Sequence, residues 1–238
     1  VTTIDYLLVS TPVVPLVHNI KPISDAPWSP HVGILFTIIS RSCNVTSLHA
    51  PKPRPLPTTR NHEGNVCSWN CTDEQFERVY EILDGSGVYV NAFGSAIGNW
   101  GKDVRDDFSI TESEIARAIP RMNRWGARYV RIMSYKVLDQ EDQLVEERIR
   151  RLRLIVEAFA SHGITCLHEN CMNYGGMSWR HTLELLEAVP GMKLVYDTGN
   201  PAFNRDRSKE ALPWQDSWEF YQQVKQQVVY LHVKDCLN

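Results

Sequence analysis

The chain has 238 residues, 43% of them hydrophobic, and a formal net charge of −3. This length fits one large α/β domain or two small ones, and the apolar fraction excludes a disordered chain. The slightly acidic balance does not favour nucleic-acid binding, which normally requires a basic surface.

Cysteine content and hydrophobic runs bear on the location of the protein. Six cysteines in a chain of this length do not indicate a disulfide scaffold, so we expect reduced thiols and a cytoplasmic protein. The longest apolar run, residues 32–39, has the length of a strand and is too short for a membrane helix. The first residues lack the basic region of a signal peptide, and no membrane partner is expected.

Residues 1–57 differ in composition from the rest of the chain. They hold nine of its 13 prolines, and prolines at this density break both helices and central strands. The sequence predicts a Pro-rich segment of uncertain structure here. It is either an extension or a stretch that is not native coding sequence, and a more regular domain follows over residues 58–238.

The pattern becomes regular from about residue 60, and the first expected helix starts at residue 72. Two helix starts carry capping boxes, Thr72 with Gln75 and Thr111 with Glu114. Apolar periodicity predicts helices over 72–87, 111–126, 140–161, 178–188 and 214–226. Strands are expected over 88–93, 128–133, 164–168, 193–196 and 228–233.

Alternating helices and strands predict parallel strands joined by right-handed crossovers. Two architectures satisfy this pattern, an open doubly wound sheet and a (β/α)8 barrel. A Rossmann or P-loop fold would require a glycine-rich phosphate loop after a strand, and none is present in the sequence.

Polar residues stand where the predicted strands end, and in a parallel array these ends share one face. Glu169, Asp197 and His232 end three successive strands. Two carboxylates and an imidazole suit Mn²⁺, Mg²⁺, Co²⁺ or Zn²⁺, and without a cation the carboxylates would repel each other. Each residue also has a structural alternative, since Asp197 begins the turn Thr-Gly-Asn-Pro and its carboxylate is able to cap that turn.

At these residues the sequence resembles the xylose-isomerase-like TIM barrel family of sugar phosphate isomerases and epimerases. The segments LHEN, VYDTGN and YLHVKD carry the resemblance, and NAFGSAIGNWG and YVRIMSY agree with it. The resemblance implies a (β/α)8 TIM-type barrel over 58–238. That barrel is incomplete, because its first strand is unclear and its eighth strand is missing. It also implies that the divalent metal ion is bound by Glu169, Asp197 and His232.

The resemblance further implies a metal-dependent isomerase or epimerase that acts on a sugar or sugar-phosphate-like substrate by proton transfer through an enediolate. Glu169 would be the catalytic acid/base. The substrate-binding residues would be Ser95, Arg131, Asn200 and Lys234. For Arg131 and Lys234 the alternative is a salt bridge at the barrel rim. Strand alternation points His168 away from the axis and predicts a packing role for it.

Three functional alternatives stay open on the sequence. A hydrolase or lyase on the same scaffold is one, and an abasic-site-type endonuclease is another, although the acidic balance argues against a DNA substrate. An inactive fragment or binding protein is the third. The expected partner is a small sugar or polyol, and a homo-oligomer is compatible with every one of these interpretations.

Overall fold

The computed structural model describes residues 7–10, 17–23, 33–38, 72–84 and 90–233. The strands are β1 (Leu7–Ser10), β2 (Val17–Ile23), β3 (Gly33–Ile38), β4 (Ala92–Gly94), β5 (Tyr129–Ile132), β6 (Thr165–Glu169), β7 (Lys193–Asp197) and β8 (Val228–Val233). The helices are α1 (Asp73–Leu83), α2 (Phe108–Trp125), α3 (Val145–Ala160), α4 (Trp179–Ala188) and α5 (Ser217–Val224).

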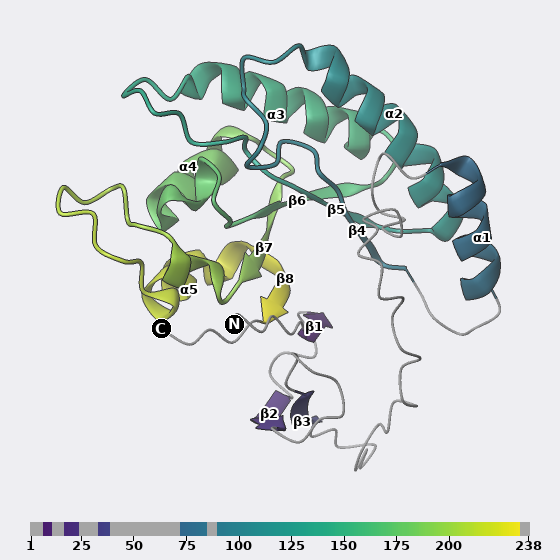
Figure 1. Cartoon of the computed structure of the whole chain (residues 1–238), viewed down its shortest axis with the longest axis horizontal. Helices are drawn as coiled ribbons and strands as arrows, with labels where there is room; N and C mark the ends of the chain where they lie inside the picture. The colour runs from purple at the N-terminus through teal and green to yellow at the C-terminus, as the bar shows by residue number, and fades with distance from the viewer. Residues whose placement is uncertain (1–6, 11–16, 24–32, 39–71, 85–89, 234–238) are drawn as a thin grey trace.

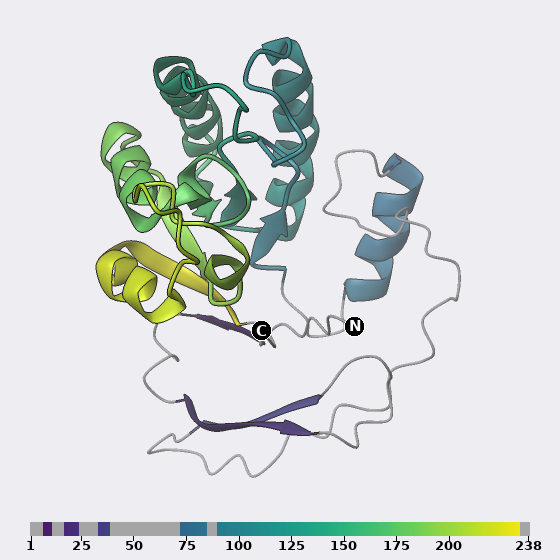
Figure 2. The ribbon, with the colours of Figure 1, turned by 60° about the vertical axis from the view of Figure 1, so that its left-hand side comes forward.

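Strands β4 to β8 form one parallel array in chain order, and β1 pairs antiparallel with the outer edge of β8. Strands β2 and β3 form a separate antiparallel pair. Helices α2 to α5 lie along the outer side of the curved parallel array, so the chain winds as a partial (β/α) barrel (Figures 1 and 2). Of the two architectures that the strand–helix alternation allows, the structure shows the incomplete TIM-type barrel that the resemblance implied.

The main core fills the layer between the parallel strands and their helices. Helix α3 contributes a buried apolar stripe at helical spacing, which consists of Leu152, Ile155, Val156 and Phe159. These side chains share one buried cluster with Val130 and Ile132 of β5, which are fully buried. The apolar stripe of α3 therefore packs into the same core as the strands, and its contacts join it to β6, the strand that follows. None of the helices in the described ranges is both long and apolar enough to cross a bilayer.

One capping prediction is confirmed and one is wrong. Thr72 caps α1, and its hydroxyl accepts from the Gln75 N–H while the Gln75 side chain accepts from the Thr72 N–H. Helix α2 begins earlier than predicted, because the Asp107 carboxylate caps it by accepting from the Ser109 N–H at 2.9 Å. Thr111 therefore lies inside the helix, where it is buried.

The C-terminus of α2 agrees with the sequence prediction, whereas the N-terminus of α5 does not. Gly126 ends α2 in a left-handed conformation, with φ of 66°. Glycine favours this conformation at the C-terminus of a helix, and the predicted helix also ended at residue 126. Helix α5 starts only at Ser217, because Asp216 caps it by accepting from the Glu219 N–H at 2.7 Å. Trp214 therefore belongs to the preceding loop, where its side chain is exposed.

Candidate metal centre

Three donor residues lie at the carboxyl ends of neighbouring strands. Glu169 and Asp197 are the last residues of β6 and β7, and His232 lies next to the last residue of β8. Asp197 and His232 are direct partners in the β7–β8 ladder. Because successive parallel strands end on one face of a barrel, the register alone brings the three side chains together.

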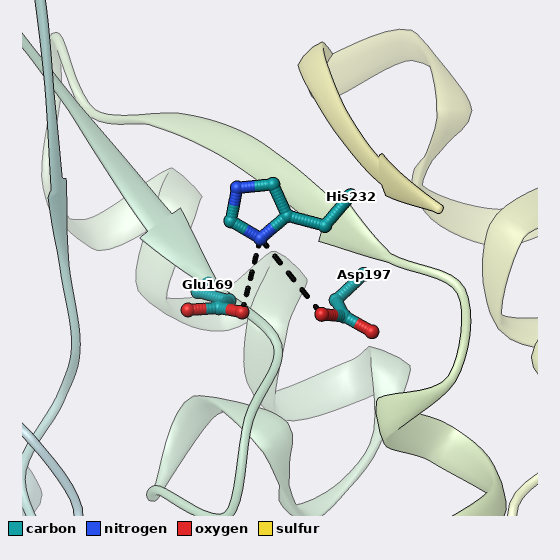
Figure 3. A group of neighbouring side chains, drawn as sticks. All are labelled: Glu169, Asp197 and His232. Carbon is teal, nitrogen blue, oxygen red and sulfur yellow. Dashed lines mark hydrogen bonds and ion pairs between the residues drawn. The ribbon is translucent and has the colours of Figure 1, made fainter. Parts of the chain in front are cut away.

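The side chains of Glu169, Asp197 and His232 point toward one another (Figure 3). The imidazole Nδ1 lies 3.2 Å from Glu169 Oε1 and 3.8 Å from Asp197 Oδ2. One ligand atom from each residue falls within 4.8 Å of the others. The three residues singled out in the sequence are therefore one cluster in space.

The two oxygens of Asp197 have different surroundings. Oδ1 accepts from the backbone N–H groups of Gly199 and Asn200, at 3.0 and 3.1 Å, and so caps the turn that follows β7. Oδ2 is the oxygen that faces His232. The capping and ligand interpretations of this residue are therefore compatible, because each uses its own oxygen.

Arg131 lies beside this cluster on β5. Its Nη1 donates to Glu169 Oε2 at 3.0 Å, and its Nη2 donates to the Ser95 carbonyl at 2.9 Å. The Ser95 hydroxyl donates in return to the Arg131 carbonyl at 2.6 Å. The structure thus shows the salt-bridge alternative for Arg131, and substrate binding by these two residues stays a prediction.

Asn200 and Lys234 complete the predicted site residues. The Asn200 amide Nδ2 donates to Glu169 Oε1 at 3.4 Å, which places it at the edge of the cluster. Lys234 lies outside the described residues. The contact of Asn200 is to a candidate ligand, and its contact with substrate stays a prediction.

Two asparagines that the sequence analysis left without a role fix the strand ends. The amide of Asn170 bonds both backbone groups of Asp197, donating to its carbonyl at 3.0 Å and accepting from its N–H at 2.7 Å. The Asn173 amide donates to the Glu169 carbonyl at 2.9 Å. Asn170 follows Glu169 directly in the sequence, at the end of a predicted strand. That position was the signal from which a contact with the end of the next strand could have been predicted.

His168 lies on the opposite side of β6 from Glu169, as alternation predicted, and it is fully buried. The Ser134 hydroxyl donates to Asn173 Oδ1 at 2.8 Å, so it accepts both the Gly175 N–H and His168 Nε2–H, at 2.7 and 3.0 Å. Burial lowers the pKa of His168 to about 4, and the imidazole is therefore neutral. Its role is packing and orientation of the loop after β6.

The chemistry of the donor set fits a divalent ion. Glu169 and Asp197 are 3% and 0% exposed, and burial of two carboxylates is costly unless positive charge compensates them. Arg131 supplies one such charge at Glu169 Oε2, whereas Glu169 Oε1 and Asp197 Oδ2 face each other across the His232 ring nitrogen. Carboxylate oxygens with an imidazole nitrogen suit a hard or borderline cation.

Comparison with known families places this site in context. The family model described as xylose isomerase-like TIM barrel matches residues 56–238, which include all three donor residues. The chain belongs to the xylose isomerase-like TIM barrel family. The resemblance noted in the motifs is confirmed, and the parallel strands of this xylose isomerase-like barrel carry the cluster where barrel enzymes build their sites.

Several solved structures share the fold. A probable 3-DHS dehydratase from Bacillus anthracis is 21% identical, with a TM-score of 0.50, and the match covers 66% of this chain and 54% of that one. A xylose isomerase-like TIM barrel protein from Mycobacterium smegmatis, solved in complex with magnesium, is 15% identical with a TM-score of 0.52 and coverage of 71% and 64%. The 3-keto-D-glucoside 4-epimerase from E. coli is 11% identical with a TM-score of 0.52 and coverage of 73% and 67%.

At these identities the likeness establishes the fold alone. This xylose isomerase-like barrel spans 54% of the dehydratase chain and 64% of the magnesium-bound one. No curated protein matches the chain. The activity must therefore be inferred from the residues of the site.

Proposed function

We propose that the protein is a divalent-metal-dependent isomerase or epimerase of a sugar or sugar-phosphate-like substrate. The observation that carries the proposal is the convergence of Glu169, Asp197 and His232 at the ends of three neighbouring strands. A hard ion held by such donors suits the adjacent hydroxyl and carbonyl oxygens of a sugar.

Glu169, Asp197 and His232 would hold one divalent ion. Mn²⁺, Mg²⁺, Co²⁺ and Zn²⁺ all suit this donor set. A bound divalent ion supplies positive charge where a substrate oxygen becomes negative. Asn170 fixes the backbone of Asp197, and the turn N–H groups fix its Oδ1, so this carboxylate is held in place before any ligand arrives. Preorganised donors of this kind lose little freedom on binding.

Glu169 is the proposed acid/base. It would take a proton from the carbon next to the substrate carbonyl and return one, with an enediolate between the two steps. Arg131 fixes Oε2 of Glu169, which leaves Oε1 as the oxygen on the side of His232 and Asn200. Arg131, Ser95, Asn200 and Lys234 are the proposed substrate contacts.

Hydrogen exchange at the carbon next to the carbonyl tests the reaction. We expect the protein with Mn²⁺ in D₂O to introduce deuterium into a ketohexose, with D-fructose and D-allulose as the probes followed by NMR. Glu169→Gln removes the proposed base and should abolish exchange, whereas Glu187→Gln, an exposed carboxylate near the end of α4, should leave it unchanged. Equal exchange by wild type and Glu169→Gln would disprove the assigned role.

A further inference from the structure

A large groove lies beyond the carboxyl ends of the strands. Its volume is about 910 Å³, within the range of small-molecule sites. It is lined by the loops that follow β4, β5, β6 and β7, and the three donors of the metal centre are not among its lining residues. Two of the lining asparagines connect it to that centre, because Asn173 bonds the Glu169 carbonyl and Asn204 bonds the Asn200 carbonyl.

Positive charge is concentrated in this groove. Four cationic side chains line it and only one acidic side chain, Asp139, does so; the cations are Arg105, Lys136, Arg205 and Arg207. The chain as a whole is acidic, with a formal net charge of −3, so the excess of cations here is local. A concave surface with one sign of charge favours a ligand of the opposite sign.

Two of the cations, Arg105 and Lys136, form ion pairs with the same buried carboxylate, that of Asp103. Arg105 Nη2 lies 2.6 Å from Asp103 Oδ2 and Lys136 Nζ lies 2.9 Å from the same oxygen, while Asp103 is only 9% exposed. The fully buried Arg148 adds to this wall by donating to the Lys136 carbonyl at 2.9 Å. Asp103 is shared between the two cations, and Asp106 adds a second negative charge near Arg105. This wall is therefore largely balanced, and the remaining lining cations are Arg205 and Arg207.

The loop after β7 presents an arginine on an aromatic ring. Arg205 Cζ lies 3.5 Å from the centroid of the Trp214 ring, and an antiparallel bridge joins the two backbones. The buried Gln215 amide secures this loop, because its Nε2 donates to the carbonyls of Gly176 and Arg205 at 2.9 and 3.1 Å. The loop that carries Arg205 is therefore held in place, and a guanidinium over an aromatic ring suits planar recognition of an oxyanion.

Exposed apolar side chains border the same groove. Trp100, Met172, Phe203 and Trp214 are between 44% and 58% exposed and all line it. Large apolar groups grouped with convergent cations are typical of sites that bind an organic anion rather than a bare inorganic one.

We propose that this groove binds the phosphate or carboxylate group of a small organic molecule whose apolar face contacts the exposed aromatic side chains. Arg205 and Arg207 bind the anion directly, and Trp100 and Trp214 contact the remainder of the molecule. Identification of that molecule as the substrate of the metal centre rests on the proposed function, but anion binding by the groove does not. A nucleic acid is less favoured, because the chain as a whole has a formal net charge of −3 and only four cationic side chains line the groove.

Calorimetric titration of the metal-free protein tests the site. The probes are phenyl phosphate, benzoate and neutral phenol, which separate phosphate from carboxylate recognition and both from simple apolar binding. The variant is the double substitution Arg205→Gln and Arg207→Gln. Its matched control is Arg180→Gln, because Arg180 is also exposed and also lies over a tryptophan ring, at 4.3 Å from that of Trp179, but does not line the groove.

We expect at least one of the two anions to bind, phenol to bind at least about tenfold more weakly, and the double variant to lose at least about tenfold in affinity. Arg180→Gln should bind as the wild type does, and added salt should weaken binding. Equal binding of phenol and the anions, or no loss in the double variant, would overturn the proposal. Binding of a single-stranded oligonucleotide without binding of either small anion would overturn it as well.

The same titration with Glu169→Gln separates this proposal from the proposed function. Glu169 is not a lining residue, so anion binding should persist in that variant even where metal binding is lost. Anion binding by a wild-type protein that binds no metal would leave the groove standing and refute the metal-dependent reaction. Loss of anion binding in Glu169→Gln with an intact fold would contradict the groove as the binding site.

Discussion

Arg131 Nη1 donates to Glu169 Oε2 at 3.0 Å and so joins the ends of β5 and β6. The glutamate side chain is only 4% exposed, so Arg131→Met leaves a buried carboxylate without its compensating charge. We expect the variant to lose about 2 kcal/mol of unfolding free energy in metal-free buffer. Saturating Mn²⁺ should reduce that loss, because the ion supplies positive charge to the same carboxylate. Urea denaturation with and without Mn²⁺ measures both values.

Arg121→Met is the matched control for this experiment. Arg121 is also largely buried and also forms an ion pair, with Asp73 at 2.8 Å, but it lies on α2 away from the cluster. Its loss of stability should be the same with and without Mn²⁺. An Arg131→Met loss that is equally insensitive to the ion would show that Glu169 does not contact the metal.

Asp103 predicts a pH dependence of stability. The hydrogen bond from Arg105, aided by Lys136 and opposed by burial, holds the pKa of this carboxyl well below its usual range. Because the unfolded chain then binds the proton more tightly, the stabilisation is fully present above the unfolded-state pKa and is lost as the pH falls. Asp103→Asn should therefore lose less unfolding free energy than wild type between about pH 5 and about pH 3.

Asp139→Asn provides the comparison, because Asp139 is an exposed carboxylate that lines the same groove. Its acid sensitivity should match that of the wild type in thermal unfolding followed by circular dichroism. If Asp103→Asn and wild type lose the same stability over this range, the ion pairs of Asp103 with Arg105 and Lys136 do not stabilise the fold.

Gly176 tests the packing of the loop after β6. A Cβ at this position would lie 1.7 Å from the Cys171 carbonyl oxygen, which is backbone and cannot move aside cheaply. Gly176→Ala should cost at least about 2 kcal/mol of unfolding free energy. Gly101→Ala should cost less than about 1 kcal/mol, because its Cβ would approach only the Asn99 side chain, at 3.2 Å. Similar denaturation midpoints for the two variants would refute this packing.

The strand ends were predictable because they depend on local sequence. An apolar run that stops at a polar residue places Glu169, Asp197 and His232 at equivalent positions, and parallel register then brings them together. The start of α2 was predicted three residues too late, because Asp107 is as good a cap as Thr111 and only the packing of the helix decides between them.

Side-chain partners across strands could not be read from the sequence. Arg131 was predicted to contact substrate or to form a salt bridge, and its partner, Glu169, lies 38 positions along the chain. The pairing of Asn170 with the Asp197 backbone likewise depends on how β6 lies beside β7. The groove is formed by four loops that are far apart in the sequence, so it could not be predicted from local sequence. No sequence motif indicated that its arginines lie together.

Metal titration tests the central claim most directly. Mn²⁺ titrated by calorimetry into metal-stripped protein should bind at one ion per chain, and Asp197→Asn should weaken that binding by at least about tenfold. Glu114→Gln is the control, since Glu114 is a similarly buried carboxylate that pairs with Lys102, lies on α2 and is not one of the three donors. Its Mn²⁺ binding should equal that of the wild type. Absence of Mn²⁺ binding by the wild type, or equal binding by wild type and Asp197→Asn, would contradict the assignment of Glu169, Asp197 and His232 as a metal centre.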